Sequence, residues 1–390
     1  MKILVVSTSF PLTPGDSLSP FIWEYCVGLR NLGWEVTVVV PHHKGTPLNE
    51  NWEGIDINRF KYLPEFLETL AYSGGLFPKV KKNPVIAFML PFFIYSMYRG
   101  ALGAIRKERF DIVNIQWLIP GCFWARRLFR KTGSRIVFTG HGTDIQISGK
   151  FPFNRFVKSA LGSAAGLTVN SNYMKGLLEG FPMPKKSAII PMGVDTGRFC
   201  PGGAGPADSN KILFIGRLIK QKGVDILLRA FDSLKMAFPK AELEIIGYGP
   251  EKEPLFVEIE RLNLGGKVIF SDPVPHEKLP DKYREARLLA MPSTIGEGFG
   301  ITVAEAAACG VPTVTFGMGG TAELVLDGET GVITKPDAES LAEGMGRLFA
   351  DDNLTSKLGE SARQRIADNY GWENISGRFD NFLKSIVNSK

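Results

Sequence analysis

The segment MPSTIGEGFGITVAEAAACGVPTV, residues 291–314, holds the side chains best suited to chemistry. Glu297 and Glu305 are separated by seven residues, and three glycines precede a helix predicted to begin near Ile301. Backbone amides at the amino end of such a helix are placed to receive phosphate oxygens. The two carboxylates can accept hydrogen bonds from neighbouring hydroxyls, although Glu305 could instead serve only the helix dipole, an effect of about 0.3 to 1 kcal/mol. The pattern predicts a site for a ligand with phosphate and hydroxyl groups.

Two cations follow an earlier predicted strand, in the sequence GRLIKQKG at residues 216–223. Gly216 permits a tight exit from a sheet. Arg217 offers a planar fork of donors and Lys222 a mobile point charge, a combination that suits a diphosphate. Alone, the two residues would be interpreted as solvated surface cations. The glycine-rich segment at 291–314 favours the diphosphate site.

The first half of the chain offers two weaker loops. In TGHGTDI, residues 139–145, His141 and Asp144 lie in a glycine-rich loop after a predicted strand, where a histidine is more often a hydrogen-bonding residue than a core residue. The loop at residues 7–21 contains Gly15 and Asp16 before a helix and could bring amides near an anion, although an ordinary strand-to-helix connection has the same composition. It lacks GxGxxG, which disfavours a dinucleotide-binding domain.

Apolar strands that alternate with helix-length segments must position these loops. Runs rich in β-branched residues alternate with helices such as 21–32 and 224–237, which is typical of α/β proteins with doubly wound parallel sheets. Two such series occur, divided by the Gly/Pro-rich stretch 200–210, which is interpreted as a linker. Since open α/β sheets bind ligands beyond the carboxyl ends of their strands, two Rossmann-like domains facing a central cleft are expected. The predicted strands are 3–6, 36–40, 112–115, 136–139, 167–170, 188–191, 212–215, 243–246, 268–270, 288–291 and 313–316.

Composition narrows the class of protein. The 390 residues are 44% apolar and 22% charged, which suits two domains with ample cores and excludes disordered or collagen-like chains. The four cysteines form no CxxC pair, and together with the four histidines they show no metal-ligand spacing. Neither a disulfide scaffold nor a metal site is expected.

Charge is divided unevenly along the chain. Residues 1–200 carry 24 Lys and Arg against 13 Asp and Glu, a net charge of +11, whereas the remainder carries 22 against 27, a net charge of −5. An anionic partner for the first half is indicated, although a merely basic surface is an equal alternative. Nucleic acid is disfavoured because no recognised nucleic-acid module is present.

The longest uncharged stretch, NPVIAFMLPFFIYSMY at residues 83–98, follows Lys79, Lys81 and Lys82. Its sixteen residues fall short of the roughly 20 that a spanning helix needs. It suits either docking on anionic lipid or a helix that covers the core. The first ten residues contain an apolar run too short for a signal peptide. A cytoplasmic location is expected, with peripheral contact at the inner face of the membrane as an option.

Taken in order, these segments resemble the retaining glycosyltransferases of family 4, which have the two-domain arrangement called GT-B. The resemblance covers nearly the whole chain. It departs from the family at Gly15, which is followed by Asp16 where many members have a second glycine. The chain also has no Asp-x-Asp, which fits a metal-independent site. The resemblance rests on FP…PG at 10–15, HGTD at 141–144, PMGVDTGRF at 191–199, GRLIKQKG at 216–223, IIGYGPE at 245–251, PSTIGEGFGIT at 292–302 and Glu305.

The resemblance implies an acceptor-binding domain at residues 1–199, a domain for a nucleoside-diphosphate sugar at 200–370, and a helix at 371–390 that packs back on the first domain. Arg217 and Lys222 would bind the diphosphate, and Glu305 the ribose hydroxyls. The implied catalytic residues are His141, Arg217, Lys222 and Glu297. The implied donor-binding residues are Gly15, Gly216, Arg217, Lys222, Val274, Glu297, Gly298, Phe299, Gly300, Ile301, Thr302 and Glu305. The implied acceptor-binding residues are Asp16, His141 and Asp144.

The expected reaction is transfer of a sugar, with retention, from a nucleoside-diphosphate sugar to a hydroxyl of a glycan or lipid-linked saccharide in cell-surface polysaccharide synthesis. No cofactor or metal is expected. Because no protein nucleophile stands out, the acceptor is expected to attack from the front face. Two other classes stay open: a sugar-nucleotide epimerase or hydrolase, which would consume donor without an acceptor, and a non-catalytic sugar-nucleotide-binding protein.

Overall fold

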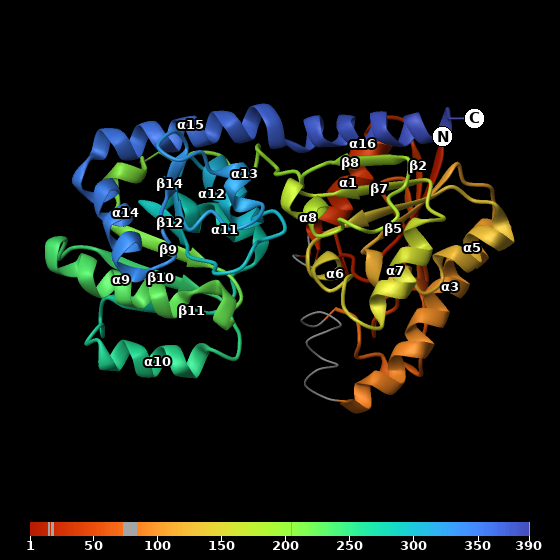
Figure 1. The fold of residues 1–390 in the computed structure, drawn as a ribbon, viewed down its shortest axis with the longest axis horizontal. Coiled ribbons are helices and arrows are strands. Elements are labelled where there is room, and N and C mark those ends of the chain that lie inside the picture. The colour runs from red at the N-terminus through yellow and green to blue at the C-terminus, as the bar shows by residue number, and fades with distance from the viewer. Residues whose placement is uncertain (15, 17–18, 73–83, 204, 390) are drawn as a thin grey trace. The chain divides into compact units, whose positions relative to one another are not determined.

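The computed structural model describes residues 1–14, 16, 19–72, 84–203 and 205–389, which form the two compact units of Figure 1. The first unit comprises Met1–Pro191 together with Ile375–Lys390, and the second comprises Met192–Asn374. Each unit is built on one sheet. The chain therefore has the two α/β domains that the alternation of strands and helices predicts.

The first unit contains an eight-stranded sheet in the order β3-β4-β2-β1-β5-β6-β7-β8, parallel except between β3 and β4. Leu4 and Val6 of β1 face a core shared with Phe93 and Met97, whereas alternate residues such as Val5 are buried on the opposite face. The strands are β1 (Lys2–Val6), β2 (Glu35–Pro41), β3 (Asn49–Trp52), β4 (Ile55–Phe60), β5 (Ile112–Gln116), β6 (Ile136–Gly140), β7 (Gly166–Val169) and β8 (Lys186–Ile189). The helices are α1 (Pro20–Asn31), α3 (Leu90–Lys107), α4 (Leu118–Gly121), α5 (Ala125–Thr132), α6 (Thr143–Gln146), α7 (Phe153–Leu161), α8 (Asn172–Gly176) and α16 (Trp372–Val387), with 3-10 turns at Glu65–Leu67 and Pro84–Met89.

The second unit contains a six-stranded parallel sheet in the order β11-β10-β9-β12-β13-β14. The order reverses beside β9, the kind of switch point at which open parallel sheets bind ligands. The strands are β9 (Lys211–Ile215), β10 (Glu242–Ile246), β11 (Val268–Ser271), β12 (Leu288–Met291), β13 (Thr313–Thr315) and β14 (Gly331–Ile333). The helices are α9 (Val224–Ala237), α10 (Lys252–Arg261), α11 (Leu279–Arg284), α12 (Ile301–Ala308), α13 (Thr321–Leu324), α14 (Ala338–Ala350) and α15 (Asp352–Tyr370), with 3-10 turns at Pro206–Asp208, Lys220–Lys222 and His276–Lys278.

Three strands escape the sequence prediction, and one predicted strand is displaced. β3 and β4 form an antiparallel hairpin whose polar residues conceal it from a search for apolar runs. Its two-residue turn, Glu53-Gly54, has positive φ at both positions (50° and 84°), the geometry that suits a tight hairpin. β14 has only three residues, and β8 lies at 186–189 instead of 188–191.

The boundary between the units also differs from the predicted one. The second unit begins at Met192 instead of residue 200. Val194 donates its N–H to the Tyr370 carbonyl at 2.8 Å, and Phe199 is buried in the core of the second unit. These residues belong to the second unit because they make their contacts there. The second unit therefore begins eight residues before the change in composition at residue 200.

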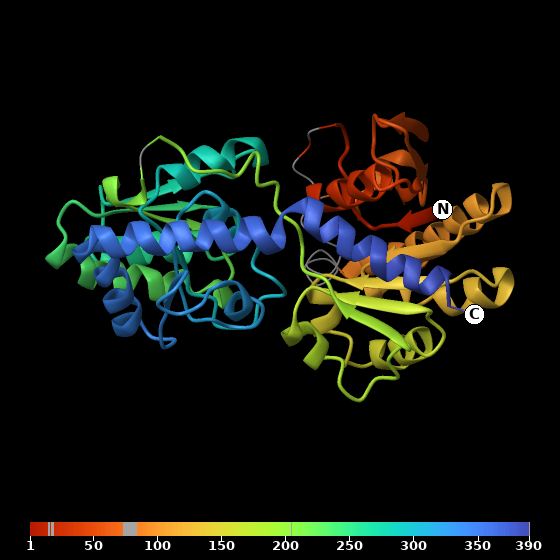
Figure 2. The same ribbon diagram turned by 90° about the horizontal axis from the view of Figure 1, so that it is seen from above.

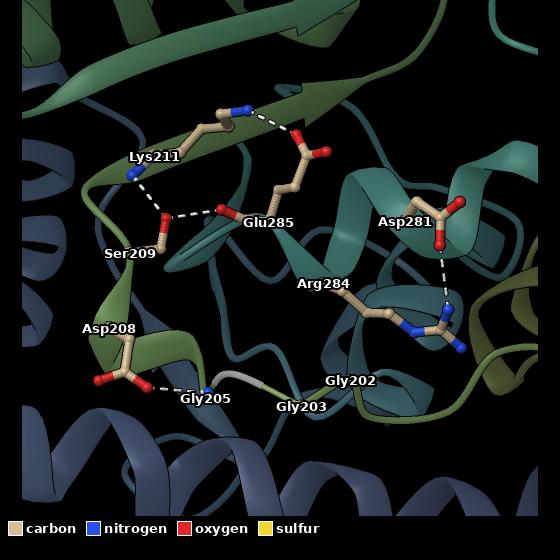
Figure 3. Close-up of a pocket in the computed structure, with 9 residues that line it drawn as sticks. All are labelled: Gly202, Gly203, Gly205, Asp208, Ser209, Lys211, Asp281, Arg284 and Glu285. Carbon is tan, nitrogen blue, oxygen red and sulfur yellow. Dashed lines mark hydrogen bonds and ion pairs between the residues drawn. The ribbon is translucent and has the colours of Figure 1, made fainter.

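The predicted linker at 200–210 is therefore wrong as the connection between domains, because it lies inside the second unit. Arg284 donates to the Cys200 carbonyl at 2.8 Å, and Arg287 donates to the Ala207 carbonyl at 2.6 Å. With Lys211 and Glu285 the segment lines a cavity of about 550 Å³ (Figure 3). A Gly/Pro-rich composition identifies an irregular connection without showing which elements it connects.

Helix α16 belongs to the first unit from Ile375 onward, although the chain reaches it from the end of the second. Trp34 donates its ring N–H to Asp380 at 2.8 Å, and the rings of Tyr25 and Phe379 meet edge to face at 4.8 Å. Figure 2 shows α16 lying alongside α1, where a side chain larger than hydrogen at Gly28 would collide with Ser376.

Helix α3 contains most of the predicted apolar stretch and has two different faces. Phe93 and Met97 are fully buried in the core, whereas Phe92 and Tyr95 are 58% and 55% exposed. The stretch Ile86–Lys107 is long and apolar enough to cross a membrane, but its inner face covers the sheet. Lys79, Lys81 and Lys82 lie outside the described residues.

Candidate active site

Close backbone contacts bring together the loops that follow the strands of the second unit. A Cβ on Gly247, after β10, would lie 1.9 Å from the carbonyl oxygen of Gly216, after β9. Gly223 has φ +67°, and a Cβ there would lie 2.1 Å from the Pro292 carbonyl, after β12. Glycine is required at both contacts because any side chain would displace a backbone. The predicted residues after β9 and β12 are therefore neighbours.

Lys222 and Glu297 form an ion pair across these loops. Lys222 Nζ lies 2.6 Å from Glu297 Oε1, and Ser293 Oγ donates to the same oxygen at 2.5 Å. The two charged side chains are only 17% and 20% exposed. Arg217 is exposed and forms no ion pair with a described carboxylate. Lys222 is thus held in place by Glu297, whereas Arg217 is available to an anionic ligand.

A helix amino end adjoins this pair. The Glu297 backbone is held against a second glycine loop, since its N–H donates to the Met318 carbonyl and its carbonyl accepts from Gly320. Gly300 turns the chain at φ +100° into α12, which begins at Ile301. The first backbone amides of a helix have no hydrogen-bond partner within that helix. In α12 these are the amides of Ile301 and Thr302. The predicted residues 298–302 therefore form one turn suited to phosphate oxygens.

Two residues in the predicted donor set take positions that limit their roles. Phe299 is 5% exposed and its ring lies 5.8 Å from that of Tyr370, so its side chain belongs to the core and only its backbone remains for a ligand. Val274 is half-buried after β11, against the core of the second unit.

Glu305 is buried on α12 with both carboxylate oxygens engaged. His276 Nε2 lies 2.7 Å from Oε1, and the Tyr283 hydroxyl donates to Oε2 at 2.8 Å. Burial raises the pKa of Tyr283 well above its usual value, so the hydroxyl keeps its proton. His276 Nδ1 is buried and has no partner among the described residues. Neither partner is predictable from the sequence, because His276 and Tyr283 lie 29 and 22 residues from Glu305 and carry no motif of their own.

His141 lies in the first unit, at the carboxyl end of β6. Its Nε2 is 2.7 Å from Gln116 Oε1, and its ring packs against those of Phe21 and Trp117 with centroids 5.0 and 4.9 Å away. Burial lowers the pKa of His141 to about 3, so the ring is neutral at physiological pH. Trp117 has φ 68°, a strained conformation that often marks a functional site.

Asp144 supports the His141 loop through hydrogen bonds to its backbone. Its side chain is buried, Oδ2 accepts from the Leu118 N–H at 2.7 Å, and Oδ1 accepts from the N–H groups of His141 and Gly142. Burial raises the pKa of Asp144 against the opposing effect of these N–H groups. The geometry favours a supporting role over direct contact with an acceptor.

The predicted loop after β1 is described only in part. Asp16 closes a turn by accepting the Leu12 N–H at 3.0 Å, whereas Gly15 lies outside the described residues. In the described ranges, no group of three or more His, Cys, Asp or Glu side chains could hold a metal ion.

The neutral state of His141 predicts a pH-dependent stability. Its folded pKa of about 3 lies below the ordinary 6.5, so between these values the unfolded state binds a proton that the folded state does not. The neutral ring therefore contributes to the free energy of unfolding. This contribution is fully present above pH 6.5 and decreases by about 1.4 kcal/mol per pH unit as the pH falls toward the folded pKa. Urea unfolding should show the wild type losing about 2 kcal/mol more than His141→Asn between pH 7 and pH 5. Equal losses would contradict a neutral ring in the folded state.

Comparisons with known proteins agree with this architecture. The family model "Glycosyltransferase Family 4" matches residues 19–198, and "Glycosyl transferases group 1" matches 203–365. The chain is 33% identical over 399 residues, 98% of both chains, to a GDP-mannose-dependent alpha-(1-6)-phosphatidylinositol monomannoside mannosyltransferase of Mycolicibacterium smegmatis. It is 32% identical to a D-inositol 3-phosphate glycosyltransferase of Corynebacterium jeikeium over 53% of this chain and 54% of that one.

Solved structures show the same fold. Sucrose-phosphate synthase from Thermosynechococcus elongatus superposes over 99% of both chains with a TM-score of 0.81 and 21% identity. Anabaena HepE in complex with UDP-glucose superposes with a TM-score of 0.73 and 18% identity, over 99% of this chain and 100% of that one. Because one relative matches at 33% identity along almost its whole length, and a family model matches each half, the chain belongs to glycosyltransferase family 4 and is a glycosyltransferase of the GT-B fold.

Proposed function

We propose that this enzyme transfers mannose from GDP-mannose, with retention, to a hydroxyl of a lipid-linked saccharide. The observation that carries the proposal is the 33% identity, along 98% of both chains, to a mannosyltransferase whose name specifies GDP-mannose and a phosphatidylinositol mannoside. The ion pair of Lys222 and Glu297 beside the start of α12 supports binding of a diphosphate at the carboxyl end of the second sheet.

Stabilisation of the leaving group is the main chemical task in this proposal. Cleavage of the bond between the anomeric carbon and the diphosphate oxygen places negative charge on the diphosphate. Lys222, Arg217 and the amides at the start of α12 supply preorganised positive charge and donors at this point. These groups take the place of a divalent cation, and we propose that the reaction is metal-independent.

Retention is proposed to result from front-face attack. The acceptor oxygen forms its bond to the anomeric carbon on the side from which the diphosphate departs, and the acceptor proton passes to the departing phosphate oxygen. Glu297 Oε1 already accepts from Lys222 and Ser293, which lowers the nucleophilicity of this carboxylate. Its proposed role is to orient Lys222 and the sugar hydroxyls, without forming a covalent intermediate.

Turnover assays with a panel of donors test the proposal. Nucleotide release is measured with GDP-mannose and with UDP-, ADP- and dTDP-sugars, with and without EDTA, and with and without a phosphatidylinositol mannoside. We expect release from GDP-mannose that requires the acceptor and is insensitive to EDTA, and an α-linked product by NMR. Equal release without acceptor would indicate a hydrolase, binding without turnover would indicate a sugar-nucleotide-binding protein, and a β-linked product would contradict retention.

We further propose peripheral docking on the inner face of an anionic membrane through the first unit. Phe88 is 79% exposed just before α3, and Phe92 and Tyr95 extend this aromatic surface along the helix. Helix α5, which packs against α3, adds exposed cations to the same unit. Exposed aromatic rings with nearby cations suit the boundary between headgroups and acyl chains. The cations of α5 are Arg126, Arg127, Arg130 and Lys131.

The triple change Phe88→Ser, Phe92→Ser and Tyr95→Ser is expected to lower binding to vesicles containing phosphatidylserine by tenfold or more, because three apolar side chains no longer insert. Co-sedimentation measures the effect. Met236→Ser, which removes a 79% exposed side chain from the second unit, serves as the control and should bind as the wild type does. Equal binding of the triple variant, or binding insensitive to anionic lipid, would contradict the docking surface.

A further inference from the structure

A chain of buried hydrogen bonds leads from a backbone carbonyl to His141. Asn114 Nδ2 donates to the Val137 carbonyl at 3.2 Å and to Thr139 Oγ1 at 3.0 Å. Gln116 Nε2 donates to Asn114 Oδ1 at 2.5 Å, and Gln116 Oε1 lies 2.7 Å from His141 Nε2. Asn114, Gln116 and Thr139 are each at most 2% exposed. These three side chains are therefore shielded from solvent, and the chain ends at the partly buried His141.

The Val137 carbonyl fixes the direction of every bond. A carbonyl oxygen can only accept, so the Asn114 amide must present its nitrogen there and its oxygen to Gln116. That oxygen also only accepts, so Gln116 must present its nitrogen to Asn114 and its oxygen to His141. The proton of the neutral imidazole must then lie on Nε2. Rotating either amide by half a turn would place two acceptors against each other.

The other ring nitrogen is left with an unused lone pair. His141 Nδ1 is buried and has no hydrogen-bond partner among the described residues. The rings of Phe21 and Trp117 pack against the imidazole, with centroids 5.0 and 4.9 Å away. Asp144, the carboxylate packed against this loop, is occupied by the backbone N–H groups of Leu118, His141 and Gly142. An unsatisfied buried acceptor is costly unless a ligand supplies its partner.

We propose that Asn114 and Gln116 are positioning residues that hold His141 with its proton on Nε2, so that Nδ1 accepts a hydrogen bond from a hydroxyl of the sugar substrate. The inference rests on the proposed function for the identity of that hydroxyl group. It assigns His141 as an acceptor and not as an acid or a donor at Nδ1. A ligand hydroxyl would bind there as a donor, and a ligand carbonyl or phosphate oxygen would be rejected.

Long-range ¹H–¹⁵N NMR of the ligand-free protein with labelled histidine tests the tautomer directly. The chain has four histidines, and the His141→Asn variant assigns the ring. We expect Nδ1 to be unprotonated and Nε2 to carry the proton at neutral pH. A protonated Nδ1 in the wild type would overturn the inference.

Three variants separate positioning from packing. Gln116→Met keeps the size of the side chain but removes the acceptor, and the Nδ1 signal should move toward its protonated position because both tautomers become populated. Gln116→Glu, as the protonated acid, donates its O–H to Asn114 Oδ1 and keeps a carbonyl oxygen toward His141, so the proton should stay on Nε2 as in the wild type. Thr168→Val is the matched control, because the Thr168 hydroxyl contacts Thr139 Oγ1 and the Phe138 carbonyl and does not lie between Val137 and His141. It should leave both ring signals unchanged.

Kinetics complete the test. Gln116→Met should lower kcat/KM by about tenfold, the effect of losing one well-placed hydrogen bond, while its melting temperature stays close to that of Thr168→Val. Wild-type ring signals and wild-type kcat/KM in Gln116→Met would overturn the inference. Absence of turnover with any sugar nucleotide would overturn the proposed function, whereas the NMR result on the free protein would still decide the tautomer.

Discussion

Replacing Lys222 with alanine is expected to lower kcat for sugar transfer by 100-fold or more, with a smaller change in the KM for the donor. Negative charge builds on the diphosphate as its bond to the sugar breaks, and removal of one preorganised donor at such a charge commonly costs about 100- to 1000-fold. Lys222 is preorganised because its Nζ is held 2.6 Å from Glu297. Arg217→Ala should act in the same direction. Nucleotide release at saturating acceptor measures both effects.

A neighbouring lysine provides the control for this prediction. Lys220 lies on the same short turn, is 70% exposed, and pairs with Asp225 at 2.9 Å. Lys220→Ala should therefore keep kcat near the wild-type value. Thermal melting of all three variants shows whether the second unit remains folded. Normal kcat in both Lys222→Ala and Arg217→Ala would contradict the proposed diphosphate site.

Glu305→Gln is expected to raise the Kd for the donor nucleotide by about 10- to 100-fold, because hydrogen bonds from ribose hydroxyls to a charged carboxylate are worth about 1.5 to 3 kcal/mol. The carboxylate is buried and already oriented by His276 and Tyr283. Calorimetric titration with GDP measures the change. In the same titration, the 2′-deoxy nucleotide should bind the wild type more weakly than GDP does. In Glu305→Gln, the two nucleotides should have similar Kd values.

Tyr283→Phe is the control for Glu305. It removes one donor to the carboxylate but keeps its charge, so it should lower thermal stability and still discriminate between ribose and deoxyribose. If Glu305→Gln discriminated between the two sugars as strongly as the wild type, Glu305 would have no role in binding ribose.

The fold follows from the sequence wherever a strand is buried on both faces. β1, β5 and β12 are such strands, and α9 occupies the predicted residues 224–237 because its apolar positions and Gly223 mark both its face and its start. The β3–β4 hairpin was missed because six of the ten residues in its two strands carry polar side chains, which conceal the alternation of apolar residues. The domain boundary was misplaced because local composition does not report long-range contacts, such as that of Val194 with Tyr370.

The candidate site was predictable where one short segment supplies it. Glu297 and the start of α12 follow from the local order of glycines and an apolar helix. Gln116, His276 and Tyr283 were missed because each reaches its partner across more than twenty residues, through contacts that depend on which loops the topology brings together. Isolated polar residues of this kind look the same in the sequence whether they face solvent or orient a buried group. The individual roles assigned to the site residues stay predictions.

The pairing of α16 with α1 has a consequence for biosynthesis. Domains usually fold in the order in which the ribosome releases them, so an amino-terminal domain is normally complete before the next one emerges. Here Trp34 donates a hydrogen bond to Asp380, which lies 346 residues later in the chain. Residues 375–390 leave the ribosome only after the entire second unit. The face of α1 that carries Tyr25 and Gly28 must stay uncovered throughout that interval. The unit that is synthesised first is thus the one whose folding is completed last.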